Sequence, residues 1–281
     1  MMDLSKLTTA DKVVGTKGQH VCLFGDSGVG KTYAAAMLAK HYKLLWFDLE
    51  NGSSTIALLP PEIQKNIYLV KIPDTRMNYL GITAMLKVTD GPCRMCAVHG
   101  TFNKVCIPCH NLKQDNMIDF DVNSLDPKEW IIVVDSGTQL SNSAMAKTFD
   151  GQDIQNVKPE YDNYTAQGVY LDRVFNNIQQ SPANYLIITH AEIIAMSKKG
   201  ASDKLAPKCG TRAWSRQFGK YFDASVYMQI RNNTYDKSSS GLDDQNVTAK
   251  SRLGVDIRKD ATQSLALLFP KNSTAVPLNK P

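Results

Sequence analysis

The sequence predicts an α/β fold built on a mostly parallel sheet, and three observations lead to this prediction. Short apolar runs alternate with segments of helical periodicity, as in folds whose parallel strands are joined by crossover helices. Residues 130–134 are all apolar and are followed by Asp135, which is typical of a central strand covered on both faces. A glycine-rich turn joins the first apolar run to the first helical segment. Because no linker separates two cores, we expect one domain over residues 1–281.

The expected elements follow this alternation in chain order. Strands are expected where apolar residues form short runs, at residues 20–25, 44–49, 67–72, 130–135, 185–189, 224–230 and 265–269. Helices are expected at residues 31–41, which are rich in alanine, at 76–88, and at 161–180, where apolar residues recur at helical spacing up to Ser181-Pro182. Residues 232–246 are expected to form a polar loop. Gly, Pro and clustered Cys break the alternation at residues 90–111, which we expect to be a small insertion.

The composition excludes two classes of protein. With 43% hydrophobic and 21% charged residues, the chain can bury a sizeable core, which excludes global disorder. No apolar run approaches the roughly 18 residues needed to span a bilayer, so we do not expect a membrane protein. The first residues include no apolar segment of the kind found in secretory signals, so we expect a cytoplasmic protein.

A phosphate-binding motif follows the first expected strand. The segment Gly25-Asp26-Ser27-Gly28-Val29-Gly30-Lys31-Thr32 fits G-x-x-x-x-G-K-[ST] in full. Its glycines let backbone N–H groups turn inward around phosphates, and the helix that follows presents its positive end to the same anion. Lys31 can reach the β and γ phosphates, and the Thr32 hydroxyl can bind Mg²⁺. The expected nucleotide contacts are Gly25, Asp26, Ser27, Gly28, Val29, Gly30, Lys31, Thr32 and Tyr33.

Asp135 is the expected partner of this motif. A buried strand that ends in Asp places a carboxylate at the carboxyl edge of the sheet, where ligands bind in open α/β folds. Asp135 would hold Mg²⁺ mostly through water. The alternative is an Asp that only caps the next turn.

Three segments together resemble the core of RecA-type ATPases. They are the phosphate loop, Leu45-Trp46-Phe47-Asp48-Leu49-Glu50 and Ile132-Val133-Val134-Asp135-Ser136. The chain most resembles the compact phage members of that superfamily that bind and anneal single-stranded DNA. The resemblance implies a RecA-like P-loop NTPase core, ATP and Mg²⁺ as cofactors, and self-assembly into a ring or filament. It also implies a single-strand-binding protein as a further partner and the host cytoplasm as location if the chain is phage-encoded.

The resemblance assigns the catalytic carboxylate to Glu50. In that family an acidic residue just past the second strand activates the water that attacks the γ-phosphate, and Glu50 is the matching position. A carboxylate can orient and partly deprotonate water beside Mg-ATP, which supports this assignment. Asp48 is the alternative base, and the remaining alternative is that Glu50 and Asn51 simply begin a turn.

The resemblance assigns roles to residues in two more segments. Leu186-Ile187-Ile188-Thr189-His190 resembles the strand that ends in a γ-phosphate sensor, so His190, assisted by Thr189, would report nucleotide state to the segment that follows. Thr248-Ala249-Lys250-Ser251-Arg252-Leu253-Gly254 resembles the K-x-R-x-G segment of RecA-type ring proteins, whose cations enter the neighbouring subunit's ATP site. Lys250 and Arg252 would there stabilise the transition state. The alternative is an exposed strand with two solvated cations.

Two C-x-x-C pairs predict a metal site in the insertion. The pairs are Cys93 with Cys96 and Cys106 with Cys109, and two such pairs can supply the four thiolates of a tetrahedral Zn²⁺ site. Four protein ligands leave no open position, so the site would be structural. His99 and His110 are reserve ligands. Two disulfides or an iron–sulfur cluster are the competing interpretations, and the expected reducing compartment favours zinc.

A basic segment follows His190 and is expected to be a long loop. Residues 195–220 carry a net charge of +6, whereas the whole chain carries +5, so the rest of the chain is nearly neutral. This local positive charge indicates a polyanionic partner. The resemblance implies that this segment contacts DNA through Lys198, Lys199, Lys204, Lys208 and Arg212. Such contacts release counterions without reading sequence. Trp214 and Phe218 could stack on bases, but their helical spacing with Tyr221 favours the core.

The sequence therefore predicts an ATPase, stimulated by DNA, that binds single-stranded DNA and supports annealing or homologous recombination. One alternative is a replicative or branch-migration helicase on the same core. Another is a DNA-binding module that uses ATP only as an assembly switch. A small-molecule phosphotransferase is a weaker alternative, because no lid is recognisable.

Overall fold

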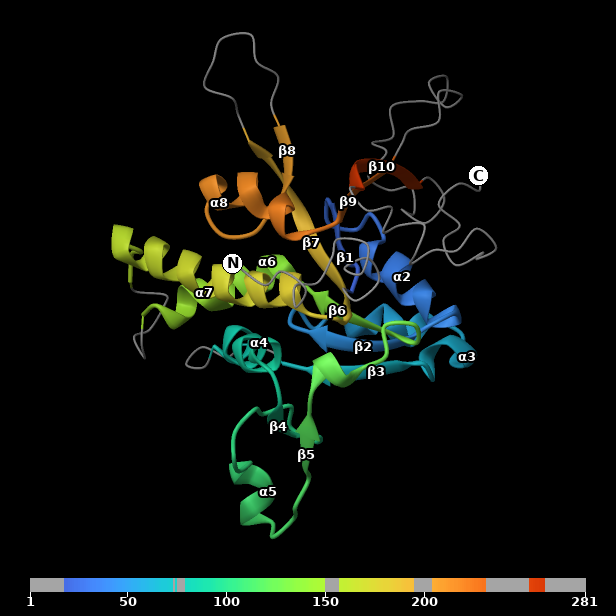
Figure 1. The fold of residues 1–281 in the computed structure, drawn as a ribbon, viewed down its shortest axis with the longest axis vertical. Helices are drawn as coiled ribbons and strands as arrows, with labels where there is room; N and C mark the ends of the chain where they lie inside the picture. Colours follow the sequence, from blue (N-terminus) through green and yellow to red (C-terminus); the bar gives the residue numbers. More distant parts are fainter. Residues whose placement is uncertain are drawn as a thin grey trace, which may run out of the picture.

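The central sheet has the mostly parallel order that the sequence predicts (Figure 1). The computed structural model describes residues 18–72, 74, 79–149, 157–194, 204–230 and 253–260. Across the sheet lie β10 (Leu253–Asp260), β9 (Ala224–Ile230), β1 (His20–Gly25), β7 (Asn184–Ile194), β6 (Trp130–Asp135), β2 (Lys43–Asp48) and β3 (Ile67–Lys71). All neighbours in this order are parallel except β10, which is antiparallel to β9.

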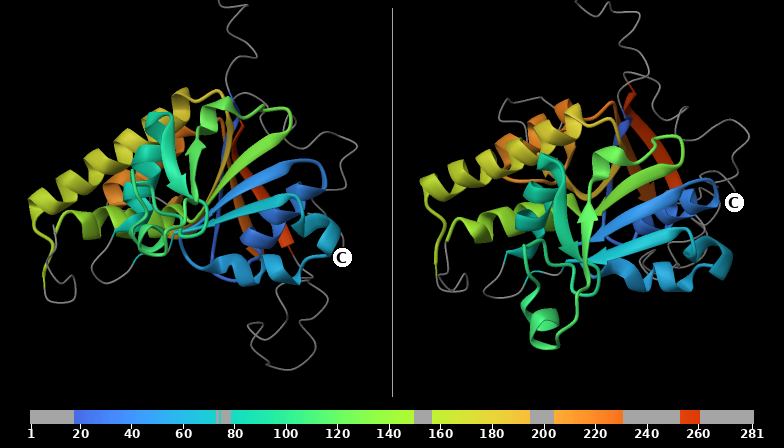
Figure 2. Two further views of the ribbon diagram at one scale, coloured as in Figure 1. Left: turned by 90° about the horizontal axis from the view of Figure 1, so that it is seen from below. Right: turned by 60° about the horizontal axis from the view of Figure 1, so that its bottom comes forward.

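Helices cover both faces of the sheet (Figure 2). On one face lie α4 (Leu80–Asp90), α6 (Gly137–Lys147), α7 (Tyr161–Gln180) and α8 (Arg212–Gln217), and on the other lie α2 (Lys31–Ala36) and α3 (Pro61–Gln64). Because side chains alternate along a strand, Ile132 and Val134 enter the first core while Ile131 and Val133 enter the second. This double burial explains why β6 is apolar along its whole length.

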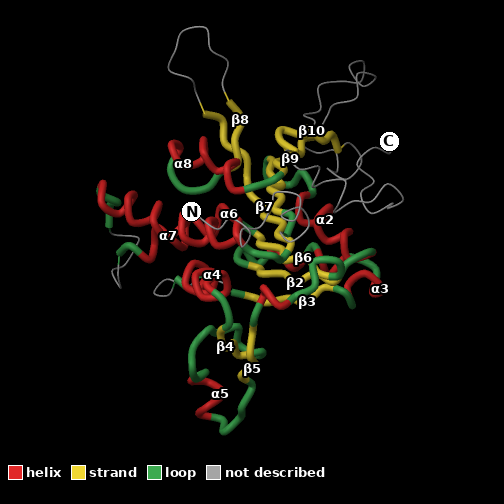
Figure 3. Tube along the Cα trace, viewed as in Figure 1, coloured by secondary structure: helices red, strands yellow, loops and turns green. Residues whose placement is uncertain are grey.

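The insertion projects from the sheet beside β3 and consists largely of loop (Figure 3). It contains β4 (Cys93–Cys96), α5 (Ile107–Asn111) and β5 (Met117–Phe120). The excursion is longer than the expected residues 90–111, because β4 pairs antiparallel with β5 and the chain rejoins the sheet only at β6. Pairing with β5 satisfies the backbone groups of β4, which the main sheet does not reach.

The expected strands at residues 20–25, 130–135 and 224–230 and the helix at 161–180 match the structure to the residue. The structure differs in the basic segment, which is expected as a loop. There β7 continues to Ile194 and pairs antiparallel with β8 (Lys204–Pro207). Apolar residues such as Ile194 and Ala206 are buried in this hairpin, which a solvated loop would leave exposed. The helix α6 is not among the expected elements, and the expected segments 232–246 and 265–269 lie outside the described residues.

No helix among the described residues combines the length and apolar character required to cross a membrane.

Candidate functional site

The carboxyl ends of four parallel strands bring the expected nucleotide-site residues together. In register, Gly25 at the end of β1 lies opposite His190 on β7, and Asp135 at the end of β6 lies opposite Ile188 on β7. Asp48 on β2 lies opposite Asp135. Because β7 separates β1 from β6, His190 emerges between the phosphate loop and the acidic strand end.

The phosphate loop has the backbone that its glycines predict. Gly28 and Gly30 have φ of 79° and 89°, in the left-handed region that favours glycine. Glycine is required at position 25 for lack of space, because a Cβ there would lie 2.3 Å from the backbone O of Met228. Lys31 is 8% exposed, and its Nζ donates to the backbone O of Gly25 at 2.9 Å and of Asp26 at 2.7 Å. Burial lowers the pKa of Lys31, and Asp135 and Glu50 oppose that shift.

The other loop residues fall into two groups by exposure. Asp26 and Ser27 are exposed at the tip of the loop, and Val29 is buried in the core beneath it. Tyr33 lies in α2 and is 37% exposed, so its ring is open to solvent one residue beyond Thr32.

The side-chain oxygens of Thr32 and Asp135, the two expected Mg²⁺ ligands, lie next to each other. The Thr32 hydroxyl donates to Asp135 Oδ2 at 3.0 Å, which places two hard oxygen ligands side by side. Burial raises the pKa of Asp135 to about 7, Glu50 and Asp48 add to the rise, and the Thr32 hydroxyl and Lys31 oppose it. A divalent cation would relieve this crowding of negative charge, so the oxygen set fits the ion that the motif implies.

Glu50 and Asp48 have different surroundings. The Asp48 carboxylate is 1% exposed and accepts from the backbone N–H of Gly52 at 2.9 Å and of Ser53 at 3.1 Å, so it fixes the loop after β2. Glu50 Oε1 accepts from the Ser136 hydroxyl at 2.6 Å. Of these two carboxylates, only Asp48 accepts hydrogen bonds from the backbone with both of its oxygens.

His190 lies against Glu50. Its Nε2 is 3.5 Å from Glu50 Oε1, and both side chains are about one third exposed. The backbone around His190 is tied to the end of the hairpin, because the Lys208 N–H donates to the His190 carbonyl at 2.7 Å. The hydroxyls of Thr138 and Thr189 donate to the Lys208 carbonyl at 2.9 and 2.8 Å.

The expected DNA-contacting cations are only partly described. Lys198 and Lys199 lie outside the described residues, and Lys204, the first residue of β8, is described only by its backbone. Lys208 is exposed beside the His190 backbone. Arg212 is exposed, with its Nε 3.5 Å from Glu192 Oε1, so a carboxylate on β7 already faces this cation.

Trp214 and Phe218 pack in the core, as their spacing predicts. Phe218 is fully buried, and the Trp214 ring lies 5.1 Å from that of Phe218 and 5.7 Å from that of Phe175. Trp214 Nε1 donates to Asp172 Oδ1 at 3.3 Å. Lys250 and Arg252, the expected cations for a neighbouring site, lie outside the described residues.

The cysteine cluster differs from the expected ligand set. Cys96, His99, Cys106 and Cys109 offer ligand atoms within 4.8 Å of one another, and Cys93 is not among them. The reason is local: residues 93–96 form a strand, and in a strand side chains three residues apart point to opposite faces. Cys93 packs against the main core, while His110 is exposed outside the cluster. The cysteines are free thiols, with Cys96 Sγ 3.6 Å from Cys109 Sγ, so the disulfide interpretation is not supported.

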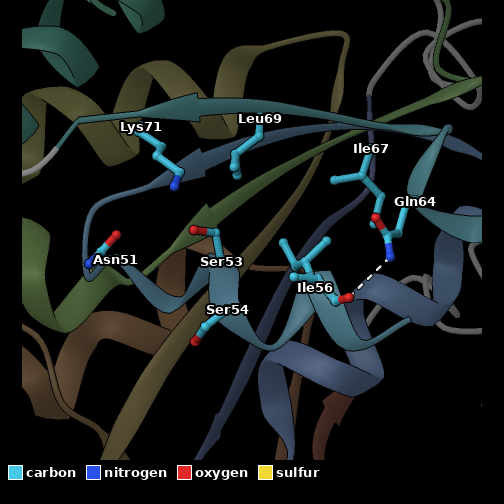
Figure 4. Close-up of a pocket in the computed structure, with 9 residues that line it drawn as sticks. Asn51, Ser53, Ser54, Ile56, Gln64, Ile67, Leu69 and Lys71 are labelled. Atoms are coloured by element: carbon cyan, nitrogen blue, oxygen red, sulfur yellow. Dashed lines mark hydrogen bonds between the residues drawn. The ribbon is translucent and has the colours of Figure 1, made fainter. Parts of the chain in front are cut away.

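A pocket of about 530 Å³ borders the loop that carries Glu50 (Figure 4). Asn51, Ser53 and Lys71 lie at one end of it, and Ile56, Gln64 and Ile67 lie at the other. Asn51 has a φ of 59°, a left-handed conformation that Asn tolerates better than most residues. None of the phosphate-loop residues lines this pocket.

Sequence reasoning missed several site residues. Ser136 fixes Glu50 and caps α6 by accepting from the Gln139 N–H at 3.2 Å. Thr138 links α6 to the hairpin. The signal for Ser136 was its place directly after Asp135, at the N-cap of an unexpected helix.

Comparisons with known proteins place the chain in a family. The family model described as "AAA domain" matches residues 17–253, which include Gly25, Asp48, Asp135 and His190. No curated protein matches the chain.

Two similar solved structures are ATPases of bacterial type III secretion systems. A prototypical one from pathogenic bacteria shares 12% identity and a TM-score of 0.43, covering 76% of this chain and 52% of that chain. The assembled ATPase EscN from enteropathogenic E. coli shares 14% identity and a TM-score of 0.40, covering 75% and 43%. The chain thus spans about half the length of these structures. On the family match and the phosphate loop, the chain belongs to the AAA-domain family of P-loop ATPases.

Proposed function

We propose that this chain hydrolyses Mg-ATP in a manner stimulated by single-stranded DNA, and that it supports DNA annealing or homologous recombination. The observation that carries the proposal is the contact between Glu50 and His190 at the root of the basic hairpin. This contact joins the proposed water-activating group to the strand that leads into the proposed DNA-binding segment.

The chain's own residues supply the groups that hydrolysis needs. Thr32 and Asp135 would hold Mg²⁺, which neutralises phosphate charge, and Lys31 would exchange its loop carbonyls for phosphate oxygens. Ser136 and His190 both reach Oε1 of Glu50, and the described residues offer Oε2 no partner. Oε2 is therefore the atom that would orient water and accept its proton.

Coupling to DNA would run through the backbone of β7. Lys208 is bonded at both its N–H and its carbonyl to the His190 region, so the hairpin cannot move without moving the His190 backbone. DNA phosphates on the hairpin cations would thus bias the His190 ring toward or away from Glu50.

The proposal has further parts. The chain would assemble into a ring or filament in which Lys250 and Arg252 reach a neighbouring copy's nucleotide, with a single-strand-binding protein as a further partner. The insertion would hold a structural Zn²⁺. The protein would work in the cytoplasm, which is that of the host if the chain is phage-encoded.

The test is ATP hydrolysis by the full chain with no nucleic acid, single-stranded DNA, duplex DNA and RNA in turn. We expect stimulation to be greatest with single-stranded DNA. Directional unwinding of a duplex would instead make the chain a helicase, and ATP-dependent DNA binding without stimulated hydrolysis would make it a switch. Stimulation by RNA alone would overturn the DNA assignment.

A matched pair of variants locates the DNA contact. The Lys198→Ala/Lys199→Ala variant removes two cations of the basic segment, so the slope of log affinity against log salt should fall by about 1.4. The control, Lys40→Ala/Lys65→Ala, removes two exposed cations and should leave the slope unchanged. Lys40 is the last residue of η2 (Met37–Lys40), and Lys65 directly follows α3. Equal slopes in both variants would remove the hairpin from the interface.

A further inference from the structure

The cluster of Cys96, His99, Cys106 and Cys109 has the dimensions of a tetrahedral metal site. Zn–S and Zn–N bonds of about 2.3 and 2.0 Å imply ligand-to-ligand edges of about 3.5 to 3.8 Å. The distances from His99 Nδ1 to the sulfurs of Cys96, Cys106 and Cys109 are 3.6, 3.4 and 3.3 Å. The Cys96 and Cys109 sulfurs are 3.6 Å apart. Four atoms of three thiols and one imidazole thus already stand at coordination spacing.

Outer hydrogen bonds orient these ligands. The backbone N–H of His99 donates to Cys96 Sγ at 3.4 Å, and Asn116 Nδ2 donates to Cys109 Sγ at 3.3 Å. Donors of this kind stabilise thiolates in metal sites. Three thiolates and an imidazole are a soft donor set that suits Zn²⁺ and excludes Mg²⁺ as the preferred ion.

The tip of the insertion has no apolar core that could replace a metal. Its buried cluster consists of Cys96, Cys106 and Cys109, with Met117 packed against it. The larger apolar side chains nearby point to solvent: the exposed fractions of Val98, Val105, Ile107 and Leu112 are between 53% and 71%. A segment this small without a core requires a metal or disulfides to stay folded, and its thiols are free.

The same cluster is attached to the end of β3 by the turn at residues 97–100. Gly100 has a φ of 61°, and a Cβ there would meet the backbone O of Lys71 at 2.7 Å, so only glycine allows this approach. The Gly100 N–H donates to the Cys96 carbonyl at 2.9 Å. The turn and β3 together line a groove of about 670 Å³ that also includes Phe120 and Trp130.

We infer that Cys96, His99, Cys106 and Cys109 bind one Zn²⁺ ion in a closed structural site, and that this ion holds the turn at residues 97–100 against the end of β3. The inference deepens the Zn²⁺ part of the proposed function and is independent of ATP and DNA. Cys93 is excluded from the site, because it lies on the opposite face of β4 and packs against the main core.

Metal content of single variants of the full chain tests the ligand set. Wild-type protein should carry one equivalent of zinc, and Cys96→Ser, Cys106→Ser, Cys109→Ser and His99→Ala should each weaken zinc binding by about a hundredfold. Cys93→Ser is the matched control and should keep the full equivalent. Loss of zinc in Cys93→Ser with retention in His99→Ala would overturn the assignment, as would wild-type protein with iron absorbance or no metal.

Cobalt substitution distinguishes loss of a ligand from loss of folding. Co²⁺ in the wild-type site should give thiolate-to-metal charge transfer of three-thiolate intensity. His99→Cys should still bind Co²⁺ and raise that intensity by about a third, since it adds a fourth thiolate. An unchanged intensity in His99→Cys would show that residue 99 is no ligand and overturn the inference.

Hydrogen exchange tests the clamp. Chelation of the metal should speed amide exchange at residues 67–71 and 96–101 while exchange at β1 and the phosphate loop stays unchanged. Unchanged exchange at residues 67–71 after complete metal removal would refute the attachment to β3. ATP hydrolysis is not the readout, so failure of the zinc site and failure of the proposed ATPase are separable.

Discussion

Substitution of Glu50 by Gln isolates the proposed chemical step. Gln has the size of Glu, and its side-chain oxygen can still accept from the Ser136 hydroxyl, so the loop should keep its conformation. The side chain is about one third exposed, which limits any loss of stability to about 1 kcal/mol. The substitution removes a base and also removes one of the negative charges that raise the pKa of Asp135. Binding of Mg-ATP should therefore be no weaker than in the wild type.

The expected effect is a fall in kcat of about 10²- to 10⁴-fold, the usual cost of losing a positioned general base. This corresponds to about 3–5 kcal/mol of transition-state stabilisation. Single-turnover hydrolysis measures the chemical step, and a fluorescent ATP analogue measures binding. Glu62→Gln, which changes an exposed acid in α3, is the matched control and should hydrolyse at the wild-type rate. Hydrolysis by Glu50→Gln within about threefold of wild type would refute the assignment of Glu50.

Two further predictions concern the phosphate loop and its acidic partner. Lys31→Ala should abolish ATP binding and turnover with the sheet still folded, as equilibrium dialysis and circular dichroism will show; normal turnover would contradict the site assignment. The folded-state pKa of Asp135, about 7, lies above the ordinary Asp value of 3.8, so the folded protein without metal holds a proton that the unfolded chain releases between those values. Its free energy of unfolding should therefore fall as pH rises from about 4 to about 7, by several kcal/mol at most. Asp135→Asn should flatten this dependence in denaturant titrations, and an equally steep profile in that variant would place the titrating group elsewhere.

The nucleotide site could be predicted from sequence because its determinants are local. The phosphate loop is one continuous segment, and its glycines and Lys31 are fixed by backbone geometry within a few residues. Asp135 could be predicted because it ends an apolar run, and burial on both faces leaves such a run few alternatives. The same rule predicts His190 directly after an apolar run, but β7 does not end there and continues to Ile194.

The ligand set of the insertion could not be predicted, because spacing alone does not say whether a C-x-x-C segment turns or extends. Residues 93–96 extend because β5, more than twenty residues later, supplies a partner strand. That long-range pairing sends Cys93 to the core and leaves His99 to complete the cluster. The spacing of the two thiol pairs therefore located the cluster, but it named Cys93 where the structure has His99.

The helix α6 escaped prediction for a different reason. It buries small polar side chains, such as Ser141 and Ser143, and satisfies them through hydrogen bonds to the Thr138 carbonyl and the Asp74 carboxylate. Hydrophobic periodicity is weak in a helix whose packed face alternates hydroxyl groups with small residues and the single large apolar residue Leu140. The local signal for this helix is its N-cap, Ser136, whose hydroxyl accepts a hydrogen bond from the Gln139 N–H.

Strand β7 is continuous from the middle of the sheet into the projecting hairpin (Figure 1). This continuity couples movements at the sheet edge to movements of the hairpin. Ile194 lies four residues beyond His190, or about 13 Å along the strand axis. A rotation of about 5° at the sheet edge would displace that point by about 1 Å, enough to make or break a hydrogen bond. The strand can thus act as a lever arm. Its stiffness determines the smallest rotation beside the nucleotide site that still displaces the far end of the hairpin.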